Sequence, residues 1–283
     1  MCGHKNAFPH SARANGISGW GYSALLVPVE GQTTLISPLG YAPNLTTGVD
    51  RAKTSVNFGE DLVQAINESH VAKIRIALAG SDIIPVVYLD ELRRNFPEMT
   101  VVFADSFLAR RRMIKSESEV KILRFAAHVA DKAVDAAVES IKPGMTESAI
   151  GTMARRIAME LGADYVVRDR VQSGSEIGRA RWPFASQRRI RRGELVSIDF
   201  VGWVGGYGFD ILRLGCAGRP NKEQRALIET AMEATNSLIE TLRDGRSVES
   251  AILRLAGMRQ DGITVEPFGH GIGLEIVEVP YLL

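Results

Sequence analysis

The sequence has little cysteine, no long apolar run and almost no net charge, and each absence excludes a class of protein. Cys2 and Cys216 are the two cysteines of 283 residues and make no disulfide framework, which fits a reducing compartment. No apolar stretch approaches the length of a membrane span, and the first sixteen residues lack the apolar core of a signal peptide. We therefore expect a cytoplasmic protein that acts without a membrane.

The charge pattern gives no reason to expect a nucleic-acid partner. Net charge is +1, from 34 basic and 33 acidic residues, so the molecule has no strong overall field. Eight arginines between Arg168 and Arg192 could form a nucleic-acid patch. Asp169 and Glu176 interrupt that run and the strands around it are apolar, so the favoured interpretation is a solvated strand-and-loop face.

Short strands and helices alternate through the first part of the chain. Strands are predicted at residues 22–29, 32–37, 73–78 and 100–104, and helices at 60–69 and 85–95. This alternation predicts a small α/β domain over residues 1–107.

A second domain is predicted over residues 108–283. Ser116 and Glu119 fit a capping box in front of a long helix. Its expected core-facing stripe repeats at three- and four-residue steps: Val120, Leu123, Ala127, Ala130, Val134 and Val138. The helix should stop at Pro143-Gly144, and Thr146 should cap a second helix that ends by Gly162. Strands are expected at 165–167 and 171–173.

Residues 195–218 read as a hairpin with one aspartate in each strand. A turn centred between Val204 and Gly205 would place Asp199 opposite Asp210, with Cβ atoms about 5 Å apart. Both lie in apolar runs, where two carboxylates repel and burial adds to the cost. Either one carboxylate takes a proton or a cation lies between them, as in two-metal hydrolases. The alternative is that a bulge turns one aspartate to solvent.

The chain also contains an internal repeat. Residues 144–150 are echoed by residues 245–252, each after a long amphipathic helix, and helices are expected at 222–244 and 248–260. The first copy leads to the aspartate hairpin. With the same offset of about 101 residues the matching hairpin would fall beyond Leu283, so we expect the second half to lack its last β-hairpin.

A glycine-flanked histidine lies near the end of the chain, in the motif Gly269-His270-Gly271-Ile272-Gly273-Leu274-Glu275. Glycines permit close backbone approach, which lets a short loop present an imidazole to an ion. Together with the aspartate hairpin, this motif resembles the pita-bread metallopeptidase family of Xaa-Pro aminopeptidases, prolidases and methionine aminopeptidases. The N-terminal α/β domain is similar to that of the creatinase and Xaa-Pro peptidase branch.

The resemblance runs from about Leu25 to the last residue. It rests on the linker 108–116, the turn 142–146, Ser197–Phe200, Asp210–Arg213 and the glycine-histidine motif. It implies an α+β pita-bread fold, in which a curved, mostly antiparallel sheet carries two helix pairs on its outer face. It also implies a homodimer.

The resemblance further implies two divalent metal ions, Mn, Co or Zn, held by two aspartates, a histidine and two glutamates. Asp199, Asp210 and His270 match the first three ligands. The glutamates, one of them the general base, are expected beyond Leu283. Glu275 and Glu278 are the nearest acids, but the family does not use the Gly-Leu-Glu position as a ligand.

Two histidines of the family's peptidases are replaced here, one near Arg181-Trp182 and one at Val277. Arg179 or Arg181 could pair with a substrate carboxylate, and Trp182 could line the substrate pocket or serve as a buried anchor. These replacements raise the question of whether the substrate is a peptide.

Three functions are therefore weighed. The first is a metal-dependent hydrolase of the Xaa-Pro peptidase type acting on a small peptide. The second is a creatinase-like or lyase-like enzyme of the same fold, because Trp182 and Val277 would make the pocket more apolar. The third is a non-catalytic pseudoenzyme or binding module. A chain clipped at both ends is favoured over a short natural form, since a missing hairpin exposes a sheet edge and apolar surface.

Overall fold

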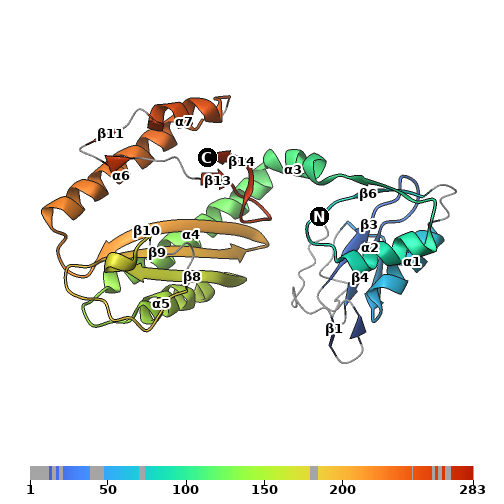
Figure 1. Ribbon diagram of the computed structural model, residues 1–283, viewed down its shortest axis with the longest axis horizontal. Coiled ribbons are helices and arrows are strands. Elements are labelled where there is room, and N and C mark those ends of the chain that lie inside the picture. Colours follow the sequence, from blue (N-terminus) through green and yellow to red (C-terminus); the bar gives the residue numbers. More distant parts are fainter. Residues whose placement is uncertain are drawn as a thin grey trace. The chain divides into compact units, whose positions relative to one another are not determined.

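The computed structural model in Figure 1 describes residues 13–14, 17–18, 22–38, 48–69, 74–178, 184–243, 245–256, 259–260, 263–264 and 269–282. The chain divides into two compact units, residues 1–108 and 109–283. Within the described ranges, no helix is long and apolar enough to cross a membrane.

The described residues of the first unit form small sheets and three helices, the last of which crosses the unit boundary. Its strands are β1 (Arg13–Ala14), β2 (Ile17–Ser18), β3 (Ala24–Leu26), β4 (Thr34–Pro38), β5 (Arg51–Ser55), β6 (Arg75–Leu78) and β7 (Thr100–Phe103). Its helices are α1 (Phe58–Glu68), α2 (Val86–Asn95) and α3 (Asp105–Met113). β3 pairs with β4 in the antiparallel sense, whereas β4–β5 and β6–β7 are parallel pairs.

The predicted strands and helices of this unit are present, with ends that shift by up to three residues. β5 was not predicted, because its sequence RAKTS is polar and mostly exposed and so carries no apolar signal. The core packs α1 and α2 against β4 through Ile36, Phe58 and Tyr88, and the rings of Phe58 and Tyr88 meet edge to face at 5.0 Å. Asp105 begins α3 and accepts hydrogen bonds from the backbone of Gly80 and Ser81.

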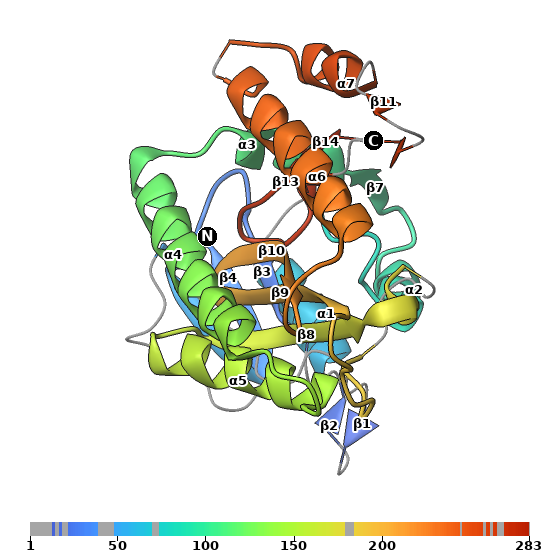
Figure 2. The same cartoon turned by 90° about the vertical axis from the view of Figure 1, so that its left-hand side faces the viewer.

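The second unit is built on an antiparallel sheet of three strands in the order β10-β9-β8. These strands are β8 (Tyr165–Ser173), β9 (Leu195–Val204) and β10 (Tyr207–Cys216). Helices α4 (Glu117–Ser140) and α5 (Glu147–Glu160) cover one face of this sheet, as Figures 1 and 2 show. β8 is one strand with a bulge between Val166 and Arg168, where the sequence had suggested two separate strands.

The face of β9 under the helices is apolar, and Val196, Ile198 and Phe200 are fully buried there. Strand side chains alternate between faces, so Asp199 and Val201 belong to the opposite face. That opposite face carries the candidate site.

The capping prediction for α4 is confirmed. The Ser116 side chain accepts from the Glu119 backbone N–H, and Glu119 accepts from the Ser116 backbone N–H. The predicted stripe is partly wrong, because Ala127 is exposed while its neighbour Ala126 is fully buried. Small alanines line the buried face, which lets α4 lie close to β10. The cap of α5 by Thr146 is also confirmed.

The second half repeats the order of two helices followed by strands. Its elements are α6 (Lys222–Thr241), α7 (Val248–Ala256), β11 (Arg259–Gln260), β12 (Ile263–Thr264), β13 (Gly269–Gly271) and β14 (Glu278–Leu282). Gly144 and Gly245, which begin the two copies of the repeat, have positive φ angles of 91° and 76°. The predicted helix to Gln260 is wrong, since α7 ends at Ala256, directly before a glycine in the sequence.

Candidate metal centre

The aspartate hairpin turns at Gly205-Gly206. Both glycines have positive φ, 58° and 82°, as a tight two-residue turn requires, and Val204 pairs with Tyr207. The predicted centre between Val204 and Gly205 is therefore wrong by one residue. Gly-Gly between two apolar runs is itself the sequence signature of this turn and could have corrected the register.

The corrected register changes how the two aspartates meet. Asp210 pairs with Val201, and Asp199 pairs with Leu212. Asp199 and Asp210 are thus diagonal neighbours on one face, with Cα atoms about 7–8 Å apart, rather than directly opposite. Their side chains are 28% and 21% exposed, so both are less buried than predicted. Burial raises the pKa of Asp210, and the charge of Asp199 raises it further.

His270 on β13 faces Asp210. Its Nε2 atom lies 3.6 Å from Asp210 Oδ2, and its Nδ1 atom lies 2.9 Å from the carbonyl oxygen of Gly271. A carbonyl only accepts, so in the neutral ring Nδ1 carries the hydrogen and Nε2 directs its lone pair toward Asp210. Metal-binding histidines characteristically donate their second N–H in this way, which fixes the tautomer.

Asp199 has a different neighbour. Arg170 is its cross-strand partner on β8, and Arg170 Nη1 lies 3.0 Å from Asp199 Oδ2. Arg168 pairs with Val201 and so lies on the same face. Sequence reasoning missed this contact, although strand alternation places 168 and 170 on the face opposite the buried Val171.

The prediction that the arginine cluster is a solvated face is wrong for two of its members. The Arg170 side chain is only 11% exposed. Arg188 Nη1 donates to Glu194 Oε2 at 2.8 Å and also contacts Ser173. Ser173 in turn donates to Glu147, which is 4% exposed at the start of α5. These two arginines form ion pairs with half-buried acids, Asp199 and Glu194.

The remaining predicted substrate residues cannot be placed. Arg179, Arg181 and Trp182 lie outside the described residues. Val277 is described, in the segment that joins β13 to β14, and is 43% exposed.

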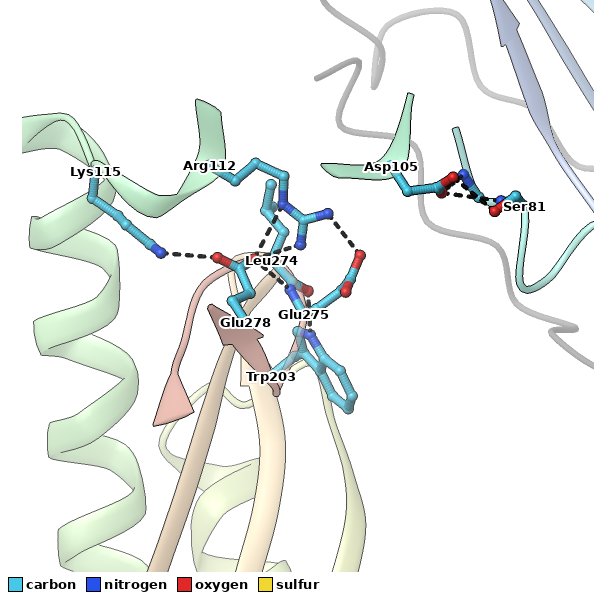
Figure 3. A network of polar contacts seen from close by, with 9 residues as sticks. Ser81, Asp105, Arg112, Lys115, Trp203, Leu274, Glu275 and Glu278 are labelled. Atoms are coloured by element: carbon cyan, nitrogen blue, oxygen red, sulfur yellow. Dashed lines mark hydrogen bonds and ion pairs between the residues drawn. The ribbon is translucent and has the colours of Figure 1, made fainter. Parts of the chain in front are cut away.

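Glu275 and Glu278 are held by cations rather than left for a metal (Figure 3). Lys115 Nζ lies 2.8 Å from Glu278 Oε2, and Arg112 Nε lies 3.2 Å from Glu278 Oε1. Arg112 Nη1 also lies 2.6 Å from Glu275 Oε1. Burial acts to raise the pKa of Glu278, but the hydrogen bonds from Lys115 and Arg112 outweigh it and lower the pKa. Sequence reasoning did not predict this ion-pair cluster.

The segment anchored by Glu278 is also fixed to the sheet. Gly208 on β10 donates to the Gly273 carbonyl at 2.7 Å, and Trp203 Nε1 donates to the Leu274 carbonyl at 3.0 Å. A Cβ on Gly273 would lie 2.6 Å from the Glu278 carboxylate, so any other residue there would push this carboxylate away from Arg112 and Lys115. The Gly208–Gly273 hydrogen bond lies two residues from Asp210 and three from His270, so it holds the two ligand candidates close together.

The donor set of this centre suits a divalent ion. Carboxylate oxygen and imidazole nitrogen bind Zn, Mn and Co. Among the residues that the structure describes, no three His, Cys, Asp or Glu side chains form a ready-made metal group. Asp210 and His270 face one another, while Asp199 lies on the same face of the sheet as Asp210 and is bonded to Arg170. Asp210 and His270 therefore present an oxygen and a nitrogen donor toward one another.

A helix-covered antiparallel sheet with two aspartates on its open face, and a glycine-flanked histidine on β13 facing one of them, is the arrangement expected of the pita-bread metallopeptidase class. Metallopeptidase family M24 matches residues 121–283, which include Asp199, Asp210 and His270. The chain belongs to this family.

The relatives agree with the family match. The Xaa-Pro dipeptidase of Pyrococcus horikoshii is 30% identical over 247 residues, covering 85% of this chain and 69% of the relative. The Xaa-Pro dipeptidase of Pyrococcus furiosus is 31% identical over 182 residues, covering 62% of this chain and 52% of the relative. The chain thus spans only part of the length of these dipeptidases.

Solved structures show the same architecture. The prolidase from Pyrococcus furiosus has a TM-score of 0.77 at 25% identity, covering 94% of this chain and 78% of that one. The prolidase from Pyrococcus horikoshii has a TM-score of 0.76 at 27% identity, with coverage of 94% and 76%. The predicted α+β pita-bread fold is confirmed.

Proposed function

We propose that this chain is a metal-dependent peptidase that hydrolyses small peptides with proline after the first residue. Asp199, Asp210 and His270 are the proposed metal ligands. The observation that carries the proposal is the facing pair of Asp210 Oδ2 and His270 Nε2, with the histidine tautomer held by the Gly271 carbonyl. With lone pairs on both atoms and a separation of 3.6 Å, His270 Nε2 and Asp210 Oδ2 can bind the same cation.

The comparisons favour a peptidase over the two other functions considered. The relatives described above are named as Xaa-Pro dipeptidases or prolidases. The substrate class proposed here follows theirs. A creatinase-like or lyase-like activity and a purely binding role have no such support.

When bound, a divalent ion such as Mn, Co or Zn would lower the pKa of a water molecule and polarise the peptide carbonyl. The chain's own residues hold and orient this centre. Asp210 and Asp199 provide carboxylate oxygens from neighbouring strands, and His270 provides one nitrogen. The Gly271 carbonyl keeps the hydrogen on Nδ1, so that Nε2 stays available.

The proposal includes a homodimer in the cytoplasm, inferred from the resemblance and from the scarcity of cysteine. Sedimentation velocity at several concentrations tests the dimer directly. A monomer at all concentrations would remove this part of the proposal without affecting the metal site.

The activity is tested with a version of the protein extended past Leu283 to the expected glutamates, incubated with Mn²⁺, Co²⁺ or Zn²⁺ and a Gly-Pro or Ala-Pro dipeptide, with Gly-Ala as the substrate control. We expect hydrolysis of the proline dipeptides only, lost in His270→Asn. Metal binding without any hydrolysis would disprove the peptidase and leave the metal centre standing. Cleavage of creatine instead would establish the small-molecule alternative.

A further inference from the structure

Arg170 and Asp199 form a sheltered ion pair inside the candidate metal centre. They are direct cross-strand partners, and Arg170 Nη1 lies 3.0 Å from Asp199 Oδ2. Only 11% of the Arg170 side chain and 28% of the Asp199 side chain are exposed, so solvent screens this pair less than a surface ion pair. One oxygen of a proposed metal ligand is therefore already bonded to a guanidinium.

The charges on this face of the sheet are balanced before any metal arrives. Arg168 and Arg170 on β8 carry two positive charges, and Asp199 and Asp210 carry two negative charges. Both arginines act electrostatically on Asp210 as well. A divalent ion bound at Asp199 would lie beside the Arg170 guanidinium, and the two like charges would repel across a partly sheltered site.

Among the residues that the structure describes, no arginine or lysine is at ion-pair distance from Asp210. Asp210 faces His270, whose Nε2 lies 3.6 Å away and can bind a metal when the ring is neutral. A cation that enters between Asp210 and His270 relieves the repulsion between the two aspartates. A cation at Asp199 has to displace a guanidinium first.

We propose that Arg170 is a built-in counter-ion that competes with divalent metal for Asp199, so that the chain loads one ion at Asp210 and His270 well before a second. This inference rests on the proposed function, because both ions would belong to the same centre. Removing the guanidinium should tighten binding of the second ion about tenfold, because the ion no longer has to break a partly sheltered ion pair.

The test is a calorimetric titration of the full chain with Co²⁺, together with metal analysis after dialysis. The variants are Arg170→Met, which removes the charge, and Arg170→Lys, which keeps it. Arg213→Met is the matched control, because Arg213 forms an exposed ion pair with Asp131 elsewhere in the same unit. Circular dichroism confirms that each variant is folded, and Arg170→Gln replaces the methionine variant if that one is not.

We expect one tight ion in the wild type, in Arg170→Lys and in Arg213→Met. Arg170→Met should bind a second ion about tenfold more tightly than the wild type does. Two equally tight ions in the wild type, or identical titrations of wild type and Arg170→Met, would overturn the role of Arg170 alone. No metal in any variant would overturn the proposed function, and this inference with it.

Discussion

Glu278 and Asp210 are two sheltered carboxylates of the same unit with opposite surroundings. The Glu278 side chain is 6% exposed and lies against Arg112 and Lys115, which lower its pKa. The Asp210 side chain is 21% exposed, and burial together with a second aspartate raises its pKa. Glu278 has two cations of the chain beside it, which stabilise its charged form. The charged groups near Asp210 are too weak to offset its burial and the neighbouring aspartate.

This difference distinguishes Glu278, which has a structural role, from Asp210, which belongs to the candidate metal centre. A buried carboxylate with two cations at bonding distance is satisfied and has no further ligand to attract. A carboxylate whose pKa stays raised beside a second carboxylate, despite the nearby histidine and arginines, would be stabilised further by a bound cation, and such a perturbed carboxylate is typical of a functional position. Glu278 holds β14, which pairs with the strand β13 that carries His270. The ion pairs of Glu278 therefore help to position His270 beside Asp210.

The largest expected effect comes from removing the Asp210 charge. Asp210→Asn should weaken Co²⁺ binding by about 100-fold or more, because a direct ligand matters at least as much as its partners. The same variant should leave the thermal stability of the metal-free protein unchanged or higher, because it removes one of two repelling charges. Calorimetric titration and a melting curve in a chelator measure the two effects. A metal-free variant that melts earlier would contradict the assignment of Asp210 as a site residue.

Glu278→Gln should do the reverse and destabilise the fold. Two cations lose their shared partner, which costs about 2–4 kcal/mol given that Arg112 remains partly exposed. Urea unfolding measures this loss. The control is Glu160→Gln, which breaks an exposed pair with Arg156 and should cost about 0.5 kcal/mol or less. Equal effects of the two substitutions would refute the structural role of Glu278.

The contribution of Glu278 to stability should depend on pH. Because the pKa of Glu278 is lowered in the folded state, its contribution is fully present above the ordinary glutamate value and is lost as the pH falls through the folded value. The difference in unfolding free energy between wild type and Glu278→Gln should therefore shrink below about pH 4.5. Urea midpoints measured from neutral to acidic pH check this. If the difference in unfolding free energy between wild type and Glu278→Gln grew in acid instead, the pKa of Glu278 would be raised in the folded state rather than lowered.

The smallest effect is expected at Trp203, which ties the His270 segment to β9. Trp203→Phe removes the N–H that donates to the Leu274 carbonyl but keeps a ring. We expect a loss of about 1 kcal/mol in unfolding free energy and only a few-fold weaker Co²⁺ binding. A loss of metal binding as large as that of Asp210→Asn would show that this hydrogen bond, rather than Glu278, positions His270.

Much of the second unit could be predicted because local signals there are strong. The capping box at Ser116 and the cap at Thr146 specify where α4 and α5 begin. The aspartates and the glycine-flanked histidine indicate the metal chemistry without any knowledge of the fold. These signals do not specify the register of the two strands. Because the predicted turn was one residue too early, Asp199 and Asp210 were predicted to lie directly opposite, whereas they are diagonal neighbours.

The contacts that were missed are long-range. Arg112 and Lys115 meet Glu278 across more than 160 residues of sequence, and no local pattern predicts such a meeting. Arg170 could have been placed on the aspartate face by strand alternation, but its partner depends on how β8 aligns with β9 around a bulge. Apolar periodicity predicts which face is buried, and it does not predict which charges meet on the other face.

The central claim is that Asp210 and His270 form the metal centre of this chain. The most direct measurement is the metal content of the wild type, Asp210→Asn and His270→Asn after loading with Co²⁺ and dialysis. We predict about one ion per chain in the wild type and almost none in either variant, with all three folded. A wild type without metal, or variants that keep as much metal as the wild type, would contradict the claim.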